Sequence, residues 1–468
     1  MLSAGRSIIS TPYHYARELL ADGRGVLVPS RDPTALAEAV DRQLSDPDLL
    51  ADHARRAAEY GRGMLWPSVA RAHVASMRRA QAEQSDARRR VFHARTLAAR
   101  STELPSLNLS HLESLTDSTG LLQHAAFGIP RYEDGYCLDD NARALLLMAL
   151  LDDADATEPR TMRQLTMRYL AFVRHAFNPE AGRFRNFMTY GRTWTEARGS
   201  EDSHGRALWA LGVVVGKSRQ PGWQSLAGQL FHDALPASGE FHSPRGIAFT
   251  LLGLDAYQQA FDGDRHVTAL QDRLSRKLSD RFDEVAGDGW SWCEDCVSYD
   301  NARLPQALIL SGHRLQDDVM VGVGLEALSW LTSIQETTDG HFSPIGSNGF
   351  YPRGGPKAAF DQQPIEACAM VSACFDAWRI TGDDRWAKEM RKAFHWFLGD
   401  NVNQTCLYDM ASGGCRDSIH ADRTNQNQGA ESTLSFLLAL TDMARFATEI
   451  RLQSADALVS TERQRAAQ

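Results

Sequence analysis

The sequence is poor in lysine and in long apolar runs. Lysine stands at only five positions, 217, 277, 357, 388 and 392, so that arginine supplies 45 of the 50 basic residues. The longest unbroken apolar stretches run about ten residues, as in 207–216, whereas a membrane-spanning helix needs about 18. No long apolar segment follows Met1, as a secretory signal would require. We therefore expect no membrane span and a cytoplasmic location.

Cysteine is also scarce. Seven residues are scattered at positions 137, 293, 296, 368, 374, 406 and 415. An odd number without a signal peptide is typical of a reducing compartment. Cys293 and Cys296 form a lone C-x-x-C motif, and no second cysteine or histidine pair follows at zinc-ligand spacing. The sequence therefore predicts buried thiols, with no metal and no cofactor.

Several catalytic motifs are absent. The sequence has no G-x-S-x-G nucleophile elbow and no H-E-x-x-H metal motif, and Gly354-Gly355 near Lys357 lacks P-loop spacing. A net charge of −9 argues against nucleic-acid binding and favours a neutral or cationic partner. Acid–base chemistry by carboxylates is the mechanism that these absences leave best supported.

The first hundred of the 468 residues alternate strands with helices. Apolar runs predict strands at 7–10 and 25–29. Helices are predicted at 13–21, 32–44, 47–60 and 66–99, and Asp32 followed by Pro33 is a typical helix start. This order indicates a β-α-β unit with a parallel strand pair. The length favours two domains, and this unit is the smaller.

This region resembles the final part of the C-terminal Rossmann domain of group 1 (GT-B) retaining glycosyltransferases. The matching segments are residues 5–13, 18–29, 32–37 and 61–67. Such transferases carry their donor-phosphate and nucleotide-binding motifs upstream of this point, and this sequence lacks them. The resemblance therefore implies a partial Rossmann-like fragment at 1–85 without transfer activity, followed by a helical linker at 86–103. A glycosyltransferase is the expected protein partner.

From residue 104 the pattern becomes one of repeated helices. Six nearly apolar helices are each opened by a polar cluster, and a more amphipathic helix follows most of them. The six begin near Asp139, Ser203, Ser243, Asp300, Gln363 and Gly429. Alternation of buried inner and amphipathic outer helices predicts a mainly α (α/α)6 toroid over 104–450, with a polar tail at 451–468. An open solenoid is the alternative.

In a closed toroid the inner helices run the same way, so their polar N-termini meet at one mouth. Capping alone explains some of these residues, because Asp, Asn and Ser are good N-caps. The clusters contain more carboxylates, amides and arginines than capping needs, and aromatic residues lie nearby. Sugars need hydrogen-bonding partners for their hydroxyls and aromatic platforms for their C–H faces. The pattern therefore favours a carbohydrate-binding funnel.

The motifs in 115–125, 135–145, 200–212, 360–367 and 427–433 resemble the helical domain that bacteria encode fused to, or beside, group 1 glycosyltransferases. The architecture is more distantly similar to that of (α/α)6 glycoside hydrolases, disaccharide-acting phosphorylases and sugar epimerases. Fold similarity does not fix function. The resemblance implies an enzyme that acts on an oligosaccharide or glycoside.

Our first hypothesis is a glycoside hydrolase, inverting, in which one carboxylic acid protonates the leaving oxygen and a second carboxylate activates water. The candidate catalytic residues are Asp140, Glu366, Glu431, Asp202, Asp300 and Asp361. Asp140 is the favoured partner carboxylate. Glu366 and Glu431 are the favoured acids, because apolar walls around a helix start would raise their pKa values.

The remaining polar and aromatic residues of the mouth are candidates for substrate binding. They are Asp139, Asn141, Arg143, His204, Arg206, Trp209, Trp292, Tyr299, His341, Tyr351, Arg353, Gln362, Gln363, Asn427 and Gln428. Three alternatives stay open. An epimerase or isomerase would use His124, His204, His242 or His341 as acid and base; a phosphorylase would replace water by phosphate; and a non-catalytic module would only bind glycans.

Overall fold

The computed structural model describes residues 1–91, 104–154, 159–287 and 289–466. The chain divides into two compact units, Met1–Ala99 and Arg100–Gln468, and each is considered by itself. Among the helices of the described residues, none has both the length and the apolar character needed to cross a membrane.

The first unit has the predicted order of elements. Strands β1 (Ile9–Ser10) and β2 (Val26–Leu27) pair in parallel, with α1 (His14–Leu19) between them. Helices α2 (Pro33–Ser45), α3 (Pro47–Gly61) and α4 (Trp66–Val91) follow, with short 3-10 turns η1 (Leu2–Ala4) and η2 (Arg62–Met64). Asp32 caps α2 by accepting the Ala35 N–H at 2.9 Å, and Pro33 opens the helix. The predicted helical residues 92–99 lie outside the described residues.

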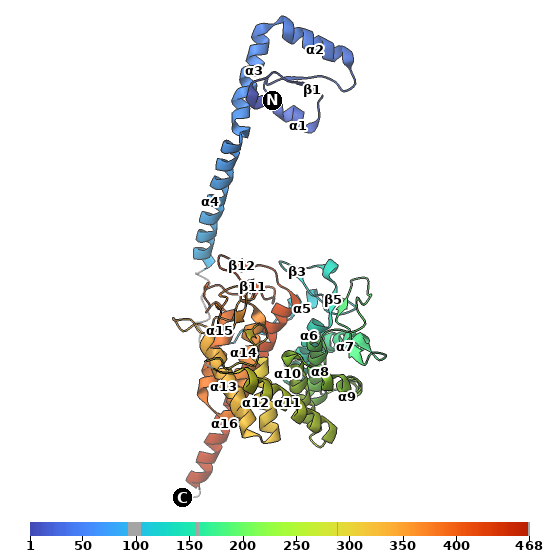
Figure 1. The fold of residues 1–468 in the computed structure, drawn as a ribbon, viewed down its shortest axis with the longest axis vertical. Helices are drawn as coiled ribbons and strands as arrows, with labels where there is room; N and C mark the ends of the chain where they lie inside the picture. The colour runs from blue at the N-terminus through green and yellow to red at the C-terminus, as the bar shows by residue number, and fades with distance from the viewer. Residues whose placement is uncertain (92–103, 155–158, 288, 467–468) are drawn as a thin grey trace. The chain divides into compact units, whose positions relative to one another are not determined.

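Contacts between its helices close the second unit into a ring. Figure 1 shows these helices below the loops that carry the short strands. In the described residues, the inner helices are α6 (Leu138–Ala154), α8 (Glu201–Lys217), α10 (Pro244–Gln258), α12 (Arg303–Leu315), α14 (Pro364–Thr381) and α16 (Ala430–Ala466). Each packs against the next, and α16 packs back against α6. The closure distinguishes a toroid from an open solenoid. Helix α16 continues across the segment expected as a polar tail.

Amphipathic helices cover the outside of this ring. They are α7 (Pro159–Ala176), α9 (Pro221–Ala234), α11 (Arg265–Val285), α13 (Asp318–Ile334) and α15 (Asp384–Phe397). Among the described residues, the sixth inner helix α16 packs on α15 and on the short α5 (Ser110–Ser114), besides its inner neighbours α14 and α6. The inner helices are buried on nearly all sides, as their apolar sequences require.

Pairs of two-residue strands shape the loops of the second unit. The antiparallel pairs are β3 (Ala125–Ala126) with β4 (Ile129–Pro130), β5 (Tyr136–Cys137) with β8 (Phe187–Met188), β6 (Phe177–Asn178) with β7 (Arg183–Phe184), β9 (Cys296–Val297) with β10 (Tyr351–Pro352), and β11 (Ser418–Ile419) with β12 (Thr424–Asn425). The 3-10 turns η4 (Tyr132–Asp134) and η5 (Leu235–Glu240) complete the loops. The connection from β5 runs directly into α6 and thereby fixes where the first inner helix begins.

Candidate active site

A cavity of about 560 Å³ lies at the N-terminal ends of the inner helices. Its described lining is dominated by carboxylates: Asp139, Asp140, Asp202, Asp361, Asp417 and Glu431. Two arginines, Arg143 and Arg206, line it as well. The polar clusters predicted to meet at one mouth therefore do so for α6, α8, α14 and α16.

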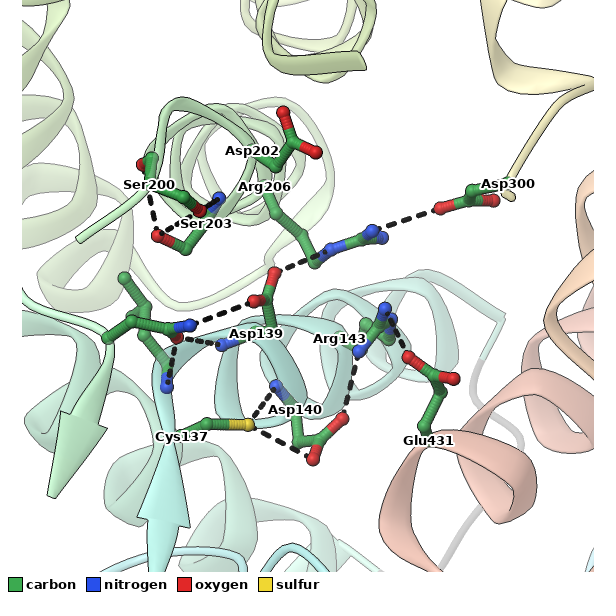
Figure 2. Close-up of polar contacts among 12 residues, drawn as sticks. Cys137, Asp139, Asp140, Arg143, Ser200, Asp202, Ser203, Arg206, Asp300 and Glu431 are labelled. Carbon is green, nitrogen blue, oxygen red and sulfur yellow. Dashed lines mark hydrogen bonds and ion pairs between the residues drawn. The ribbon is translucent and has the colours of Figure 1, made fainter. Parts of the chain in front are cut away.

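Arg143 joins two of these carboxylates (Figure 2). Its Nη1 donates to Asp140 Oδ1 and its Nη2 lies on Glu431 Oε2, both at 2.8 Å. Because the terminal nitrogens of a guanidinium are about 2.3 Å apart, these two carboxylate oxygens are at most about 8 Å apart. Asp140 comes from the first turn of α6 and Glu431 from the first turn of α16. The closure of the ring thus brings the two carboxylates together.

The surroundings raise the pKa values of both carboxyl groups. For Asp140, burial is the largest cause and outweighs the opposing charge of Arg143. For Glu431, the surrounding protein also raises the pKa, against the same arginine. The Glu431 side chain is 44% exposed toward the cavity, whereas that of Asp140 is 8% exposed. Both carboxyl groups therefore keep their protons to higher pH than freely exposed Asp and Glu side chains do.

Arg206 makes a second bridge across the mouth. Its Nε donates to Asp139 Oδ1 and its Nη2 to Asp300 Oδ2, each at 2.9 Å (Figure 2). Burial would raise the pKa of Asp300, but Arg206, Arg303 and Arg143 outweigh it and hold that pKa below its usual value. Asp300 is therefore a buried counter-ion. It is not among the described residues that line the cavity.

The start of α6 is held by side chains from neighbouring elements. Asn186 Oδ1 accepts the N–H groups of Leu138 at 3.1 Å and Asp139 at 3.3 Å, and its Nδ2 donates to Asp139 Oδ2 at 3.2 Å. The Cys137 thiol donates to Asp140 Oδ2 at 3.1 Å. Burial raises the pKa of this thiol well above its usual value, so it acts as a donor. Both acidic residues are thus fixed before any ligand binds.

Three further carboxylates face the cavity with different partners. Asp202 accepts short hydrogen bonds from Ser243 Oγ and Tyr299 Oη. Asp361 Oδ1 lies 3.4 Å from His420 Nδ1. Asp417 accepts the Gly429 N–H, and burial raises its pKa.

The serines at two helix starts act as caps, and Ser243 Oγ also donates to Asp202. Ser200 Oγ accepts the Ser203 N–H at 3.0 Å, and Ser243 Oγ accepts the Gly246 N–H at 3.3 Å. Capping therefore accounts for these serines but not for the carboxylates beside them. Among the described residues, no group of three His, Cys, Asp or Glu side chains is arranged to hold a metal ion.

Glu366 lies elsewhere than expected. Its carboxylate accepts the Asp300 N–H in a short bond and the Asn301 side-chain amide at 2.8 Å. Burial, and then the charge of Asp300, raise its pKa to about 7. The residue is buried and is not among the described residues of the cavity lining. It supports the turn before α12 from behind the cavity wall.

The structure divides the predicted binding residues into two sets. Asp139, Arg143, Arg206, Tyr299 and Gln363 line the cavity. The other described candidates do not belong to its lining: Asn141, His204, Trp209, Trp292, His341, Tyr351, Arg353, Gln362, Asn427 and Gln428.

Buried partners explain most of the second set. His204 Nδ1 accepts the Phe184 N–H at 3.3 Å and its Nε2 lies 3.0 Å from the Ala234 carbonyl. Burial lowers the pKa of His204 to about 3, so a neutral ring fills this position. Trp292 is fully buried against Phe282.

The amides of this set satisfy neighbouring groups. Asn141 bonds both backbone groups of Leu121, and Gln362 accepts from Trp396 Nε1. Asn427 accepts the Phe127 N–H, and Gln428 accepts from Ser412 Oγ.

The last residues of this set make contacts away from the mouth. Trp209 stacks on Phe249, and the Arg303 guanidinium lies over its ring. His341 pairs with Asp400, Arg353 donates to the Val285 carbonyl, and Tyr351 packs on Trp290.

The sequence-based candidates did not include other lining residues, among them Gln123, Phe187 and Asp417. His124, named only for the isomerase alternative, also lines the cavity, and its Nδ1 lies 3.3 Å from Asp134 Oδ2. These residues lie on loops between helices. No periodic pattern in the sequence marks them as part of the mouth.

Comparisons with known proteins support the fold. No family model and no curated protein matches the chain. Solved structures do match. Cellobiose 2-epimerase from Spirochaeta thermophila DSM 6192 is 12% identical over 74% of this chain and 94% of its own, with a TM-score of 0.56. A family 76 glycoside hydrolase from a bovine Bacteroides thetaiotaomicron strain is 10% identical over 73% of this chain and 76% of its own, with a TM-score of 0.51.

A D-mannose isomerase is similar at the same level: 12% identity over 71% of this chain and 94% of its own, with a TM-score of 0.52. At such identities the likeness establishes the fold and not the reaction. The predicted (α/α)6 toroid is confirmed. The resemblance of residues 1–85 to glycosyltransferases stays a prediction.

Proposed function

We propose that this chain is a carbohydrate-active enzyme, and that it is a glycoside hydrolase which uses Asp140 and Glu431. The observation that carries the proposal is the Arg143 bridge, which holds both carboxylates on one cavity with their bonded oxygens at most about 8 Å apart. The two carboxyl groups lie roughly 6.5–9.5 Å apart in inverting glycosidases and about 5–5.5 Å apart in retaining ones. The bound of about 8 Å fits a two-carboxylate site of either kind, and inversion is the part of the proposal that the product anomer tests. A cavity of about 560 Å³ is large enough for a small glycoside.

Glu431 is the proposed general acid, and Asp140 its partner. Glu431 is the more exposed of the two, and its raised pKa keeps a proton available for the leaving oxygen. Asp140, held by Arg143 and Cys137, activates a water that attacks the anomeric carbon from the opposite face. The sugar–oxygen bond breaks as the new carbon–oxygen bond forms, and the configuration inverts. The anomer released first, observed by NMR, tests inversion.

We further propose that water rather than phosphate is the second substrate. Both lining arginines already contact carboxylates, Arg143 with Asp140 and Glu431, and Arg206 with Asp139 and Asp300. An incoming phosphate would meet six carboxylates without a free guanidinium among the described lining residues. Like charges at such range repel strongly in a partly desolvated site.

A second candidate function is epimerisation or isomerisation of a free sugar. His124 favours it, because this side chain lines the cavity and is oriented by Asp134. The His420–Asp361 pair adds a second histidine near the rim. In this reaction one histidine would remove a proton from a sugar carbon and another group would return it. The epimerase and isomerase folds named above are compatible with it.

One assay separates these functions. The protein is incubated with a panel of α- and β-linked oligosaccharides, and reducing ends and monosaccharide composition are measured. Hydrolysis releases reducing ends, and E431Q or D140N should lower the rate by about 10²–10⁴-fold. The exposed Glu180→Gln serves as the matched control and should leave it unchanged. Unchanged cleavage by E431Q and D140N would refute the assigned pair.

The alternatives give other outcomes. Conversion of one monosaccharide into another without new reducing ends, lost in His124→Asn, would favour the epimerase. Binding alone would mean a glycan-binding module.

For the first unit we propose a partner-binding role, with a glycosyltransferase as the partner. Leu36, Val40 and Leu44 are exposed at four-residue spacing along α2, so one face of this helix carries an uncovered apolar stripe. Charged substitutions such as L36E and L44E should leave sugar cleavage unchanged and abolish co-purification with a glycosyltransferase from the same cell. Retained co-purification would refute this role.

A further inference from the structure

Two phenyl-type rings line the described part of the cavity, those of Phe187 and Tyr299. Tyr299 is already engaged, because its hydroxyl donates to Asp202 and the Arg245 guanidinium lies over its ring. Strand β8 pairs with β5 so that Phe187 is opposite Cys137 and Met188 is opposite Tyr136. Successive side chains on a strand point to opposite faces. Tyr136 and Met188 belong to a buried apolar cluster, so Cys137 and Phe187 point the other way. Both of them line the cavity.

The backbone that carries this ring is fixed. Glu196 Oε1 accepts the N–H groups of Asn186 at 2.8 Å and Phe187 at 3.1 Å. The Phe187 carbonyl accepts the Thr195 N–H at 3.0 Å. The same Asn186 side chain holds Asp139 at the start of α6. Phe187 is therefore rigidly placed. It directly follows Asn186, the residue that holds Asp139 at the start of α6.

The ring itself has little protein to pack against. Phe187 is 45% exposed. Among the ring contacts and cation–π contacts of the described residues, none involves it. A phenyl group that faces water gains free energy when an apolar surface covers it. The carboxylates and arginines that line the cavity are hydrogen-bonding and charged groups, which offer no apolar surface to the C–H face of a sugar.

We propose that Phe187 is the platform on which a pyranose ring in the cavity stacks with its C–H face. This inference rests on the proposed function and adds a binding and specificity residue to it. Aromatic rings stack favourably on apolar faces, and a polar wall opposite fixes which face turns toward the ring. Phe187 lines the same cavity as Asp140 and Glu431. Its side chain has no ionisable proton, so it contributes to binding and not to the proton transfers.

The test compares F187A, F187L and F187W in the full chain. Phe261, which is 54% exposed and lies outside the described cavity lining, supplies the matched control F261A. Affinity for methyl glucoside, methyl mannoside and methyl galactoside is measured by ligand-observed NMR titration, with thermal melting to verify folding. F187A should bind the preferred glycoside roughly tenfold more weakly. F187W should restore binding, F187L should restore only part of it, and F261A should match the wild type.

Each result bears on the platform or on the proposed function. Wild-type binding that F187A retains within twofold, with both proteins folded, overturns the platform and leaves the proposed function standing. Weaker binding in F187L than in F187A would also overturn it. If the wild type cleaves an oligosaccharide of the panel, removal of the phenyl ring in F187A should raise KM and leave kcat nearly unchanged. If the wild type neither binds nor cleaves any sugar, the proposed function fails and the platform fails with it.

Discussion

At the scale of single residues, Arg143 opposes the effect of burial on the pKa values of the candidate catalytic pair, Asp140 and Glu431. Its positive charge lowers the pKa values of Asp140 and Glu431, although burial raises both. Without that charge, both carboxyl groups should bind their protons to higher pH. We expect Arg143→Met to move both limbs of the pH profile of kcat/KM upward, by about one unit.

The control for this prediction is Arg143→Lys. It keeps the charge without the fork that reaches both carboxylates, so the limbs should move less than in R143M. A profile that stays in place in R143M, with the variant folded, would mean that Asp140 and Glu431 do not set the pH dependence.

A second residue-scale prediction concerns Glu366. Burial, then the charge of Asp300, raise its pKa to about 7 from a usual value of 4.5. Between these values the folded protein holds a proton that the unfolded chain has released, so stability should fall as pH rises through this window, by on the order of 3 kcal/mol. E366Q has no such proton. Other buried carboxyl groups with raised pKa values act in the same direction. Urea unfolding from pH 4 to 8 should therefore show a smaller fall in stability in E366Q than in wild type and the control E180Q; parallel curves would contradict the prediction.

The sequence could not separate Glu366 from Glu431. Both are acidic residues in the first turn of an apolar inner helix, so the same pattern predicts the same position. The difference comes from the turn before α12, where Asp300 adopts a left-handed conformation (φ 49°) and points its N–H at Glu366. That turn covers Glu366, whereas nothing comparable covers Glu431. A local pattern carries no information about a turn some sixty residues away.

At the scale of elements, glycines bring α8 and α10 close together. A Cβ at Gly212 would lie 2.1 Å from the Gly253 carbonyl oxygen, and one at Gly205 would lie 2.4 Å from that of Gly246. The two glycines of α8, Gly205 and Gly212, are seven residues apart, and so are Gly246 and Gly253 of α10. Seven residues are about two helical turns, so both contacts lie on one face of each helix. Helix α8 carries Asp202 and Arg206, and helix α10 carries Arg245. The close packing of the two helices therefore sets the distance between these side chains.

We expect Gly212→Ala to lower stability by about 1–3 kcal/mol, because the helices must separate to admit a methyl group. The matched control is Gly228→Ala in α9, where the new Cβ would lie 3.8 Å from Val215 Cγ2. This is an ordinary contact, and alanine should stabilise the helix by about 0.5–1 kcal/mol. Thermal or urea unfolding of both variants checks the opposite signs. Equal changes in stability in the two variants would mean that the close approach of α8 and α10 at Gly212 does not exclude a methyl group.

Elements differ in how far sequence reveals them. The inner and outer helices were predictable because each carries an apolar pattern over three turns or more. The two-residue strands β5 and β8 were not, since two residues have no periodicity. Because β8 places Phe187 in the cavity, its absence from the prediction also hid that residue. The same limit applies to Asp417, next to β11.

At the scale of the whole molecule, the arginine excess has a structural use. Arg143, Arg206, Arg245 and Arg303 lie near the starts of inner helices, and in the structure their guanidiniums contact the protein. Arg245 donates to Glu294 and to the Tyr299 carbonyl, and Arg303 donates to Gln306. Each guanidinium is thus already engaged with groups of the protein, and the two that line the cavity, Arg143 and Arg206, each bridge two carboxylates.

This distribution of charge leads to the last prediction, on ligand selectivity. In the described lining, six carboxylates face two paired arginines. The chain as a whole carries −9. A ligand that brings another negative charge is repelled, whereas a protonated amine is attracted. We expect inhibition constants to rise in the order glucosamine, glucose, glucuronate, with glucuronate at least about tenfold weaker than glucose.

The same order should hold in the manno and galacto series, because it depends on charge and not on stereochemistry. The N-acetylated amine is the matched control, since it keeps the nitrogen and loses the charge, and it should bind no better than the neutral sugar. Raising the salt concentration should narrow the differences, since ions screen the exposed part of the field. Asp417→Asn, which removes one carboxylate that contacts the Gly429 N–H, should weaken the preference for the amine. A uronate that binds as well as the neutral sugar would contradict the assigned charge of the cavity, because no described lining guanidinium is free to receive it.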